Sequence, residues 1–100
     1  MKKNVRKEKL KSLLLREISE IIRRDVDLPE NLFVTVQGVE LSKDNSKATV
    51  FISSLKKEDA LHAVNILNRA EGYIHHLLGK RLKMRVVPRP HFVVAPEVLF

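Results

Sequence analysis

The sequence predicts an α+β domain in which helices pack on one face of a three-stranded sheet, in the order α-β-β-α-kink-α-β. Two stretches carry apolar residues at helical spacing, and the second stretch restarts after a glycine. Between them lies a segment of alternating apolar and polar residues, which is typical of a β-hairpin. The chain has 100 residues and 44% apolar content. This is enough for one core, so we expect a single domain over residues 1–100 with its core at about 5–94.

The first element is an amphipathic helix expected over residues 5–24. Its apolar positions recur at intervals of three and four, which places them on one side of a helix. They are Leu10, Leu13, Leu14, Ile18, Ile21 and Ile22. Proline disfavours helical geometry in the residue before it, so the helix should end ahead of Pro29.

A β-strand follows at about residues 34–41, and its apolar pattern changes phase near the middle. Val34 and Val36 occupy even positions, whereas Val39 and Leu41 occupy odd positions. One extra residue is needed at the change, and Gly38 fits a β-bulge there.

The polar cluster at residues 42–46 predicts a turn that leads into a second strand at 47–53. We interpret Asp44 as a turn residue that hydrogen-bonds the local backbone, not as a catalytic acid. The second strand alternates between two faces, and its apolar face carries Ala48, Val50 and Ile52.

Two helices separated by a kink are expected between Ser54 and Leu82. Ser53 or Ser54 is suited to cap the first of them. The apolar positions of this pair are Ala60, Val64, Leu67, Ile74, Leu77 and Leu78. Glycine inside a helix is about 1 kcal/mol less favourable than alanine, so we place a kink or break at residues 69–72, around Gly72.

The closing strand is expected at about Lys83 to Val94. Pro88 and Pro90 have no N–H to donate to a neighbouring strand. The strand should therefore be bulged or lie at an edge of the sheet.

Charge is the strongest functional signal in the sequence. The chain has 19 Lys and Arg against 12 Asp and Glu, which gives a net charge of +7. Residues 1–24 hold nine basic and three acidic residues, and residues 69–91 hold six basic and one acidic residue. A small domain with this balance usually faces a polyanion, although a charge run can also be a solvated face.

Several classes of chemistry find no support in the sequence. The absence of cysteine excludes disulfides and thiolate zinc sites. His75 and His76 are neighbours that diverge on a helix, so we interpret them as solvated and expect no metal site. No phosphate-binding or nucleophile motif occurs, so we expect no enzyme activity and no cofactor. Apolar runs are short and no secretory signal is present, so we expect a cytoplasmic protein without a membrane partner.

Nucleic-acid binding is the function that the charge pattern favours. Basic residues follow the second helix pair, and the first helix adds Arg6, Lys9 and Arg16 outside its apolar stripe. We expect Phe33, Phe51 and Phe92 to lie in strands and to pack in the core. Binding should therefore depend on phosphates and shape rather than on an aromatic base-stacking sheet.

Two segments resemble bacterial ribosome-binding factor A. One is the hairpin VTVQGVELSKD at residues 34–44, with ATVFIS at 48–53 after it. The more specific one is AEGYIHHLLGK at residues 70–80, followed by LKMRVVP at 82–88 and by His91-Phe92. The resemblance covers about residues 5 to 92.

This resemblance implies a type II KH-like fold in which an Ala-x-Gly kink, here Ala70 and Gly72, replaces the usual Gly-x-x-Gly loop. It also implies binding to the small (30S) ribosomal subunit and its rRNA, a part in late 16S rRNA maturation including 5′-end processing, and a role in cold adaptation. The resemblance adds Lys80, Arg85, Arg6 and Arg16 as matching basic positions. We expect the protein to act as a monomer.

Combining charge, spacing and resemblance, we predict one set of RNA-binding residues. They are Arg6, Lys9, Arg16, Arg69, Ala70, Gly72, Lys80, Arg81, Arg85 and Arg89. At the kink, small residues would let an RNA backbone approach the helix junction; alternatively, Gly72 only ends one helix and starts another. Two other functions remain open, namely a general KH-type single-stranded RNA-binding domain and a basic module that docks on a protein.

Overall fold

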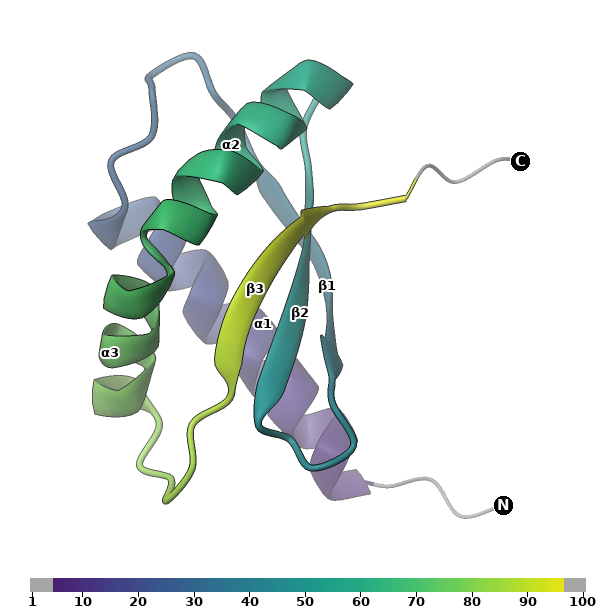
Figure 1. Ribbon diagram of the computed structural model, residues 1–100, viewed down its shortest axis with the longest axis vertical. Coiled ribbons are helices and arrows are strands. Elements are labelled where there is room, and N and C mark those ends of the chain that lie inside the picture. Colours follow the sequence, from purple (N-terminus) through teal and green to yellow (C-terminus); the bar gives the residue numbers. More distant parts are fainter. Residues whose placement is uncertain (1–4, 97–100) are drawn as a thin grey trace.

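The computed structural model describes residues 5–96, and its elements follow the predicted order (Figure 1). They are α1 (Val5–Asp25), β1 (Thr35–Leu41), β2 (Lys47–Ser53), α2 (Lys57–Arg69), α3 (Glu71–Arg81) and β3 (Arg89–Val94). The predicted α+β class with one three-stranded sheet is therefore confirmed. The expected domain limits at residues 1 and 100 lie outside the described part of the chain.

The sheet is mixed and has the strand order β1-β2-β3. β1 runs antiparallel to β2, and β3 runs parallel to β2. The register between β1 and β2 shifts between Val36 and Gly38, so Gln37 is an extra residue on β1. This confirms the predicted bulge, which lets both halves of β1 direct their apolar side chains toward the helices.

The turn between β1 and β2 is held by its own polar side chains. The Asp44 carboxylate accepts hydrogen bonds from the Ser46 hydroxyl at 2.7 Å, the Ser46 N–H at 3.1 Å and the Ser42 hydroxyl at 2.9 Å. Asn45 has a positive φ of 61°, which asparagine tolerates better than most residues. The turn role predicted for Asp44 is thereby confirmed.

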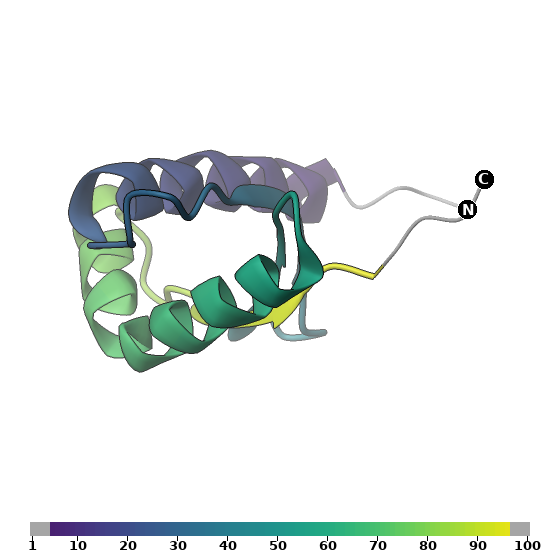
Figure 2. The same cartoon turned by 90° about the horizontal axis from the view of Figure 1, so that it is seen from above.

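The helices pack on one face of the sheet. Seen from above, α1, α3 and α2 form three sides of a frame, and the strands lie at the fourth side (Figure 2). The buried core draws on all of these elements. Its fully buried large side chains include Leu14, Ile18, Ile21, Val50, Ile52, Leu67, Ile74, Leu78 and Phe92. The apolar spacing in the sequence thus identified the inward sides of the helices.

The closing strand is shorter than predicted, because β3 begins at Arg89 and not near Lys83. Arg89 pairs with Lys47, the first residue of β2, and the chain before Lys47 is already the hairpin turn. Residues 83–88 therefore have no strand to pair with. Met84 and Val86 are 40% and 59% exposed, so their alternation does not reflect a buried strand face. The predicted edge position of β3 is confirmed.

The predicted caps of α2 are wrong. Lys56 is the N-cap residue of this helix and makes no side-chain capping bond. Ser53 accepts a hydrogen bond from the Gln37 side chain on β1, and the Ser54 hydroxyl donates to the Phe33 carbonyl. Both serines thus stabilise the end of the hairpin, and the helix begins a few residues later.

The three phenylalanines were all predicted to lie in strands and pack in the core, but they differ in burial. Phe92 is buried in the core and Phe51 is partly buried on β2. Phe33 precedes β1 and is 70% exposed, so the prediction that it packs in the core is wrong.

Candidate RNA-binding surface

The α2–α3 junction turns at a single residue, Ala70. Its backbone (φ −93°, ψ 9°) leaves helical geometry, while its N–H donates to the carbonyls of Ile66 and Leu67 at 3.1 Å each. Its carbonyl in turn accepts the N–H of Ile74 at 2.9 Å, so α3 starts at once. The kink predicted at residues 69–72 is confirmed at this position.

Gly72 lies in the first turn of α3 and is exposed. A Cβ added to this glycine would meet no heavy atom within 4 Å, and its φ is not positive. Neither packing nor backbone geometry within the described residues therefore requires glycine here. The position leaves an open approach to the helix backbone beside the kink.

Arg89 on β3 forms an ion pair with a residue of this junction. The Arg89 Nε lies 3.1 Å and 3.0 Å from the two carboxylate oxygens of Glu71, the first residue of α3. Glu71 is thus neutralised by a residue on a neighbouring element. The pair also fixes the direction of the Arg89 side chain, which is still 58% exposed.

The C-terminal end of α3 carries two basic neighbours with different surroundings. Lys80 is exposed, and no described carboxylate forms an ion pair with it. Arg81 instead reaches α1, where its guanidinium lies 3.1 Å from Glu17 and 3.8 Å from Asp25. Arg81 therefore joins α3 to α1, whereas Lys80 points its charge to solvent.

Two further predicted residues flank the helix pair. Arg69 is the last residue of α2 and is exposed. Arg85 is exposed in the segment between α3 and β3, not in the strand where it was expected. Together with Ala70, Gly72, Lys80 and Arg89, these residues surround α3, and we call this set the α3 surface.

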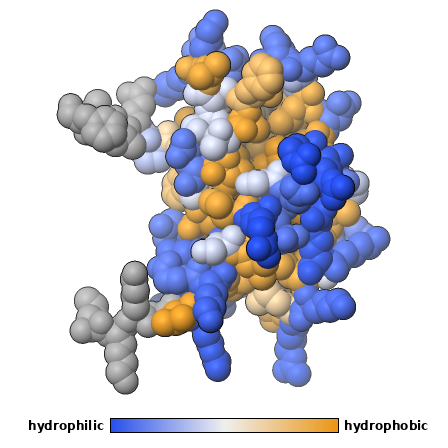
Figure 3. All heavy atoms as spheres, turned by 180° about the vertical axis from the view of Figure 1, so that it is seen from behind, coloured by the Kyte–Doolittle hydropathy of each residue, from blue (hydrophilic) through white to orange (hydrophobic). Residues whose placement is uncertain are grey.

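The other predicted cations lie on α1. Arg6, Lys9 and Arg16 are exposed, and Lys9 and Arg16 line a shallow surface hollow beside Leu13. From behind, where α1 faces the viewer, hydrophilic side chains project around an apolar central band (Figure 3). We call Arg6, Lys9 and Arg16 the α1 surface.

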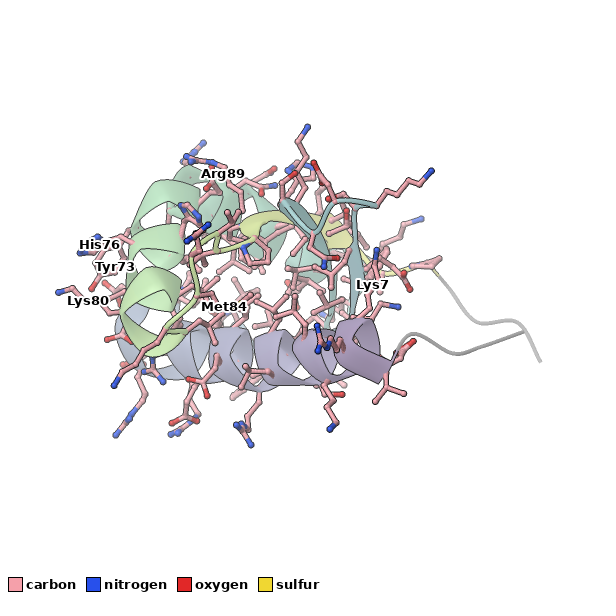
Figure 4. The ribbon with its side chains drawn as sticks, turned by 90° about the horizontal axis from the view of Figure 1, so that it is seen from below. Lys7, Tyr73, His76, Lys80, Met84 and Arg89 are labelled. Atoms are coloured by element: carbon pink, nitrogen blue, oxygen red, sulfur yellow. The ribbon has the colours of Figure 1, made fainter. Side chains whose placement is uncertain are left out.

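The α1 surface approaches α3 at one end only: Glu17 pairs with both Arg16 and Arg81, so Arg16 lies beside the C-terminal end of α3. α3 meets α1 at Glu17, which is about 16 Å along the helix from Arg6 at 1.5 Å per residue. Lys7, next to Arg6, lies at the opposite end of the molecule from Lys80 (Figure 4). The Lys7 ammonium group donates to the Ser42 carbonyl at 2.9 Å, which ties this end of α1 to the hairpin turn.

Ion pairs within α1 neutralise the negative charge of Glu20 on the C-terminal half of the helix. The hydrogen bond from Arg23 is the main cause that lowers the pKa of Glu20, and the charges of Arg23 and Arg24 act in the same direction. Glu20 is therefore an anion already engaged with cations of its own helix. Glu17 and Glu71 are also paired, with cations that come from other elements, Arg81 on α3 and Arg89 on β3.

The histidines do not form a metal site. Among residues 5–96 no group of three His, Cys, Asp or Glu side chains could hold a metal ion. His76 is exposed as predicted, but His75 is half buried and its Nε2 lies 3.1 Å from the Val87 carbonyl. His75 thus ties α3 to the following segment and is not simply solvated.

The sequence-based prediction of the binding surface did not include Tyr73. Tyr73 is 51% exposed on α3 and is not among the predicted RNA-binding residues. Its spacing of three and seven residues from His76 and Lys80 was the available signal, since these intervals place side chains on one side of a helix. Only the fold shows that this side is not covered.

These observations define a small α+β domain with a mixed three-stranded sheet, a kinked helix pair and a basic helical surface, as expected for the type II KH-like fold that the resemblance implies. The family model described as ribosome-binding factor A matches residues 6–98. The chain therefore belongs to the ribosome-binding factor A family. No helix within residues 5–96 is both long and apolar enough to cross a membrane.

Curated relatives and solved structures agree with this assignment. Ribosome-binding factor A of Thermodesulfovibrio yellowstonii is 42% identical over 88 residues, which cover 88% of this chain and 75% of that protein. The crystal structure of ribosome-binding factor A from Thermus thermophilus is 34% identical with a TM-score of 0.76, covering 88% of this chain and 94% of its own. A homology model of Thermus thermophilus ribosome binding factor A, fitted into the cryo-EM map of a 30S complex, is 32% identical with a TM-score of 0.73 and covers 86% of this chain and 91% of its own.

Proposed function

We propose that this protein binds the free small ribosomal subunit and assists late maturation of the 16S rRNA, including processing of its 5′ end. The observation that carries the proposal is the similarity to the Thermus thermophilus factor fitted into a 30S complex, at a TM-score of 0.73. The protein would act by binding, without a catalytic step, and a role in cold adaptation is part of the same proposal. A ribosomal partner would place it in the cytoplasm.

The α3 surface is the part of the molecule best suited to touch rRNA. Between Gly72 and Pro96 the chain holds five Lys and Arg and no acidic residue. The carboxylates beside α3, those of Glu71, Glu17 and Asp25, are already paired with Arg89 and Arg81. Exposed cations without competing anions attract phosphates, so this surface would form the first contact and the α1 surface a second one.

The kink would let the RNA backbone come close. Ala70 is small, and the space where a Gly72 side chain would stand is empty. A phosphodiester could therefore approach the start of α3, with Arg69 beside it and Lys80 further along the helix.

Co-sedimentation with separated ribosomal fractions tests the proposal. We expect the protein to migrate with free small subunits and not with assembled ribosomes. If about four to six phosphates are neutralised, the logarithm of affinity should fall with the logarithm of salt at a slope of about −3 to −5. Equal affinity for unrelated RNAs would instead indicate a general single-stranded RNA-binding domain, and a slope near zero would indicate protein docking.

Ala70→Glu tests the contribution of the kink. The added bulk and negative charge should weaken binding to small subunits, and circular dichroism of the same sample should report a folded domain. Gly72→Ala adds only a methyl group into open space, so a loss of binding in this variant would also support close approach of the RNA backbone. A native melting curve with undiminished binding for Ala70→Glu would leave the kink a purely structural joint.

A further inference from the structure

The outer side of α3 carries an aromatic ring, an imidazole and an ammonium group in a row. Tyr73, His76 and Lys80 are spaced by three and four residues, so they stand one above another on the helix. All three are exposed, and Figure 4 shows them along the same outward side of α3. We call these residues the Tyr73 stripe.

A shallow hollow of about 480 Å³ borders the Tyr73 stripe. His76 and Lys80 line it together with Gly72 and Gly79. Neither glycine would place a Cβ within 4 Å of another described atom, so the helix backbone is open on this side. The hollow therefore leaves room for a ligand beside the His76 ring and the Lys80 ammonium group, next to the exposed Tyr73.

Charge decides which kind of ligand fits. The 25 residues from Gly72 to Pro96 contain five Lys and Arg and no Asp or Glu. The carboxylates beside α3, those of Glu71, Glu17 and Asp25, are paired with Arg89 and Arg81. An exposed aromatic ring on the same helix side as an unpaired cation is a combination that binds single-stranded nucleic acid, where bases stack and phosphates pair with cations. Leu61 on α2 is exposed to the same degree as Tyr73, at 53% against 51%, but it offers no ring for stacking.

We propose that the Tyr73 stripe binds an unpaired segment of RNA, with one base stacked on the Tyr73 ring and a nearby phosphate on the Lys80 ammonium group. His76 offers a second ring to the neighbouring base. Tyr73 and Lys80 are about 10 Å apart along the helix axis at 1.5 Å per residue, so a short run of nucleotides reaches both. The inference rests on the proposed rRNA function, and it adds that the RNA contacted here is single-stranded and is held by stacking.

The composition of the chain provides a direct measurement. It has one tyrosine and no tryptophan, so tyrosine fluorescence of the full chain reports on Tyr73 alone. Titration with a short single-stranded RNA should quench this fluorescence, because a stacked base lies against the excited ring. The duplex formed by the same RNA and its complement should not, because its bases are already stacked. Absence of quenching by single-stranded RNA at saturating concentration would overturn the proposal.

Variants separate stacking from simple apolar contact. Measured with end-labelled single-stranded RNA, Tyr73→Phe should keep the affinity, whereas Tyr73→Leu and Tyr73→Ala should weaken it about five- to a hundredfold. Leu61→Ala is the matched control on α2 and should leave the affinity unchanged. If Tyr73→Leu bound as tightly as Tyr73→Phe, the stripe would be an apolar contact for a protein and the proposal would be wrong.

The same variants distinguish this inference from the proposed function. Wild-type co-sedimentation with small subunits, combined with no quenching and no effect of Tyr73→Ala, would reject the stripe alone. Failure of the wild type to co-sediment would reject the ribosomal role, while the quenching titration would still decide whether the stripe stacks on RNA.

Discussion

Asn68 on α2 and Phe92 on β3 are joined by two reciprocal hydrogen bonds. The Asn68 amide donates to the Phe92 carbonyl at 2.8 Å, and the Phe92 N–H donates to the Asn68 side-chain oxygen at 2.9 Å. β3 is an edge strand, so these backbone groups have no strand beside them. One side chain thus satisfies both groups and holds the kinked helix pair against the sheet.

Replacing this side chain should destabilise the domain. In Asn68→Ala the partly buried N–H and carbonyl of Phe92 lose their partner, which we expect to lower the free energy of unfolding by roughly 1–3 kcal/mol. Urea denaturation followed by circular dichroism measures the change. Asn65→Ala is the matched control, because Asn65 lies on the same helix and is exposed. Equal stability of the two variants would show that water replaces the Asn68 side chain.

The apolar stripe of α1 should be purely structural. Leu14 is fully buried, so Leu14→Ala leaves a cavity and should lower the free energy of unfolding by about 2–5 kcal/mol. Leu61→Ala, at an exposed position, should change it by less than about 0.5 kcal/mol. Thermal melting checks both variants, and an unchanged melting temperature for Leu14→Ala would mean that α1 is not docked on the sheet.

Lys80 and Arg81 are neighbours with the same charge, and the structure predicts different roles for them. Lys80→Gln removes an unpaired exposed cation, so it should reduce the salt slope of small-subunit binding by about 0.7–0.9 and leave stability unchanged. Arg81→Gln breaks the contact with Glu17 and should lower stability by up to about 1 kcal/mol, with a smaller effect on the slope. Identical salt slopes for the two variants would contradict this division.

The hairpin turn should respond to acid through Asp44. Hydrogen bonds from Ser46 and Ser42 lower the pKa of the Asp44 carboxyl to about 2, below its value of about 3.9 in an unfolded chain. A lowered pKa stabilises the fold above the unfolded value, and this stabilisation is lost as the pH falls from about 4 to about 2. The difference in melting temperature between wild type and Asp44→Asn should therefore shrink over this range. A constant difference would mean that the charge of Asp44 does not contribute.

The local sequence pattern was sufficient to predict the features that depend on a single segment of the chain. The apolar spacing around Leu14 and Ile18 identified the buried side of α1, because a helix repeats every 3.6 residues. The phase change at Gly38 identified the bulge, because strand side chains alternate strictly. Gly72 placed the kink within residues 69–72, since glycine opposes helix continuation, although the chain turns at Ala70 and Gly72 is already helical.

The boundaries of other elements depended on partners far away in the chain. Met84 and Val86 alternate like strand residues, but β2 offers no backbone to pair with before Lys47. The role of Ser54 also depends on a distant residue, because its hydroxyl donates to the Phe33 carbonyl instead of capping α2. In each case a local preference gave way to a contact that only the assembled sheet provides.

By itself the sequence determined the α+β class, the order of the elements, the inward side of each helix and the strong positive charge, since all of these follow from composition and short-range periodicity. Only the tertiary structure decided which cations remain available. It paired Arg81 with α1 and Arg89 with Glu71, left Lys80 exposed, and placed Tyr73 on an uncovered side of α3. The physical reason is that ion pairing and exposure depend on which distant segments lie side by side, and this relationship has no period along the chain.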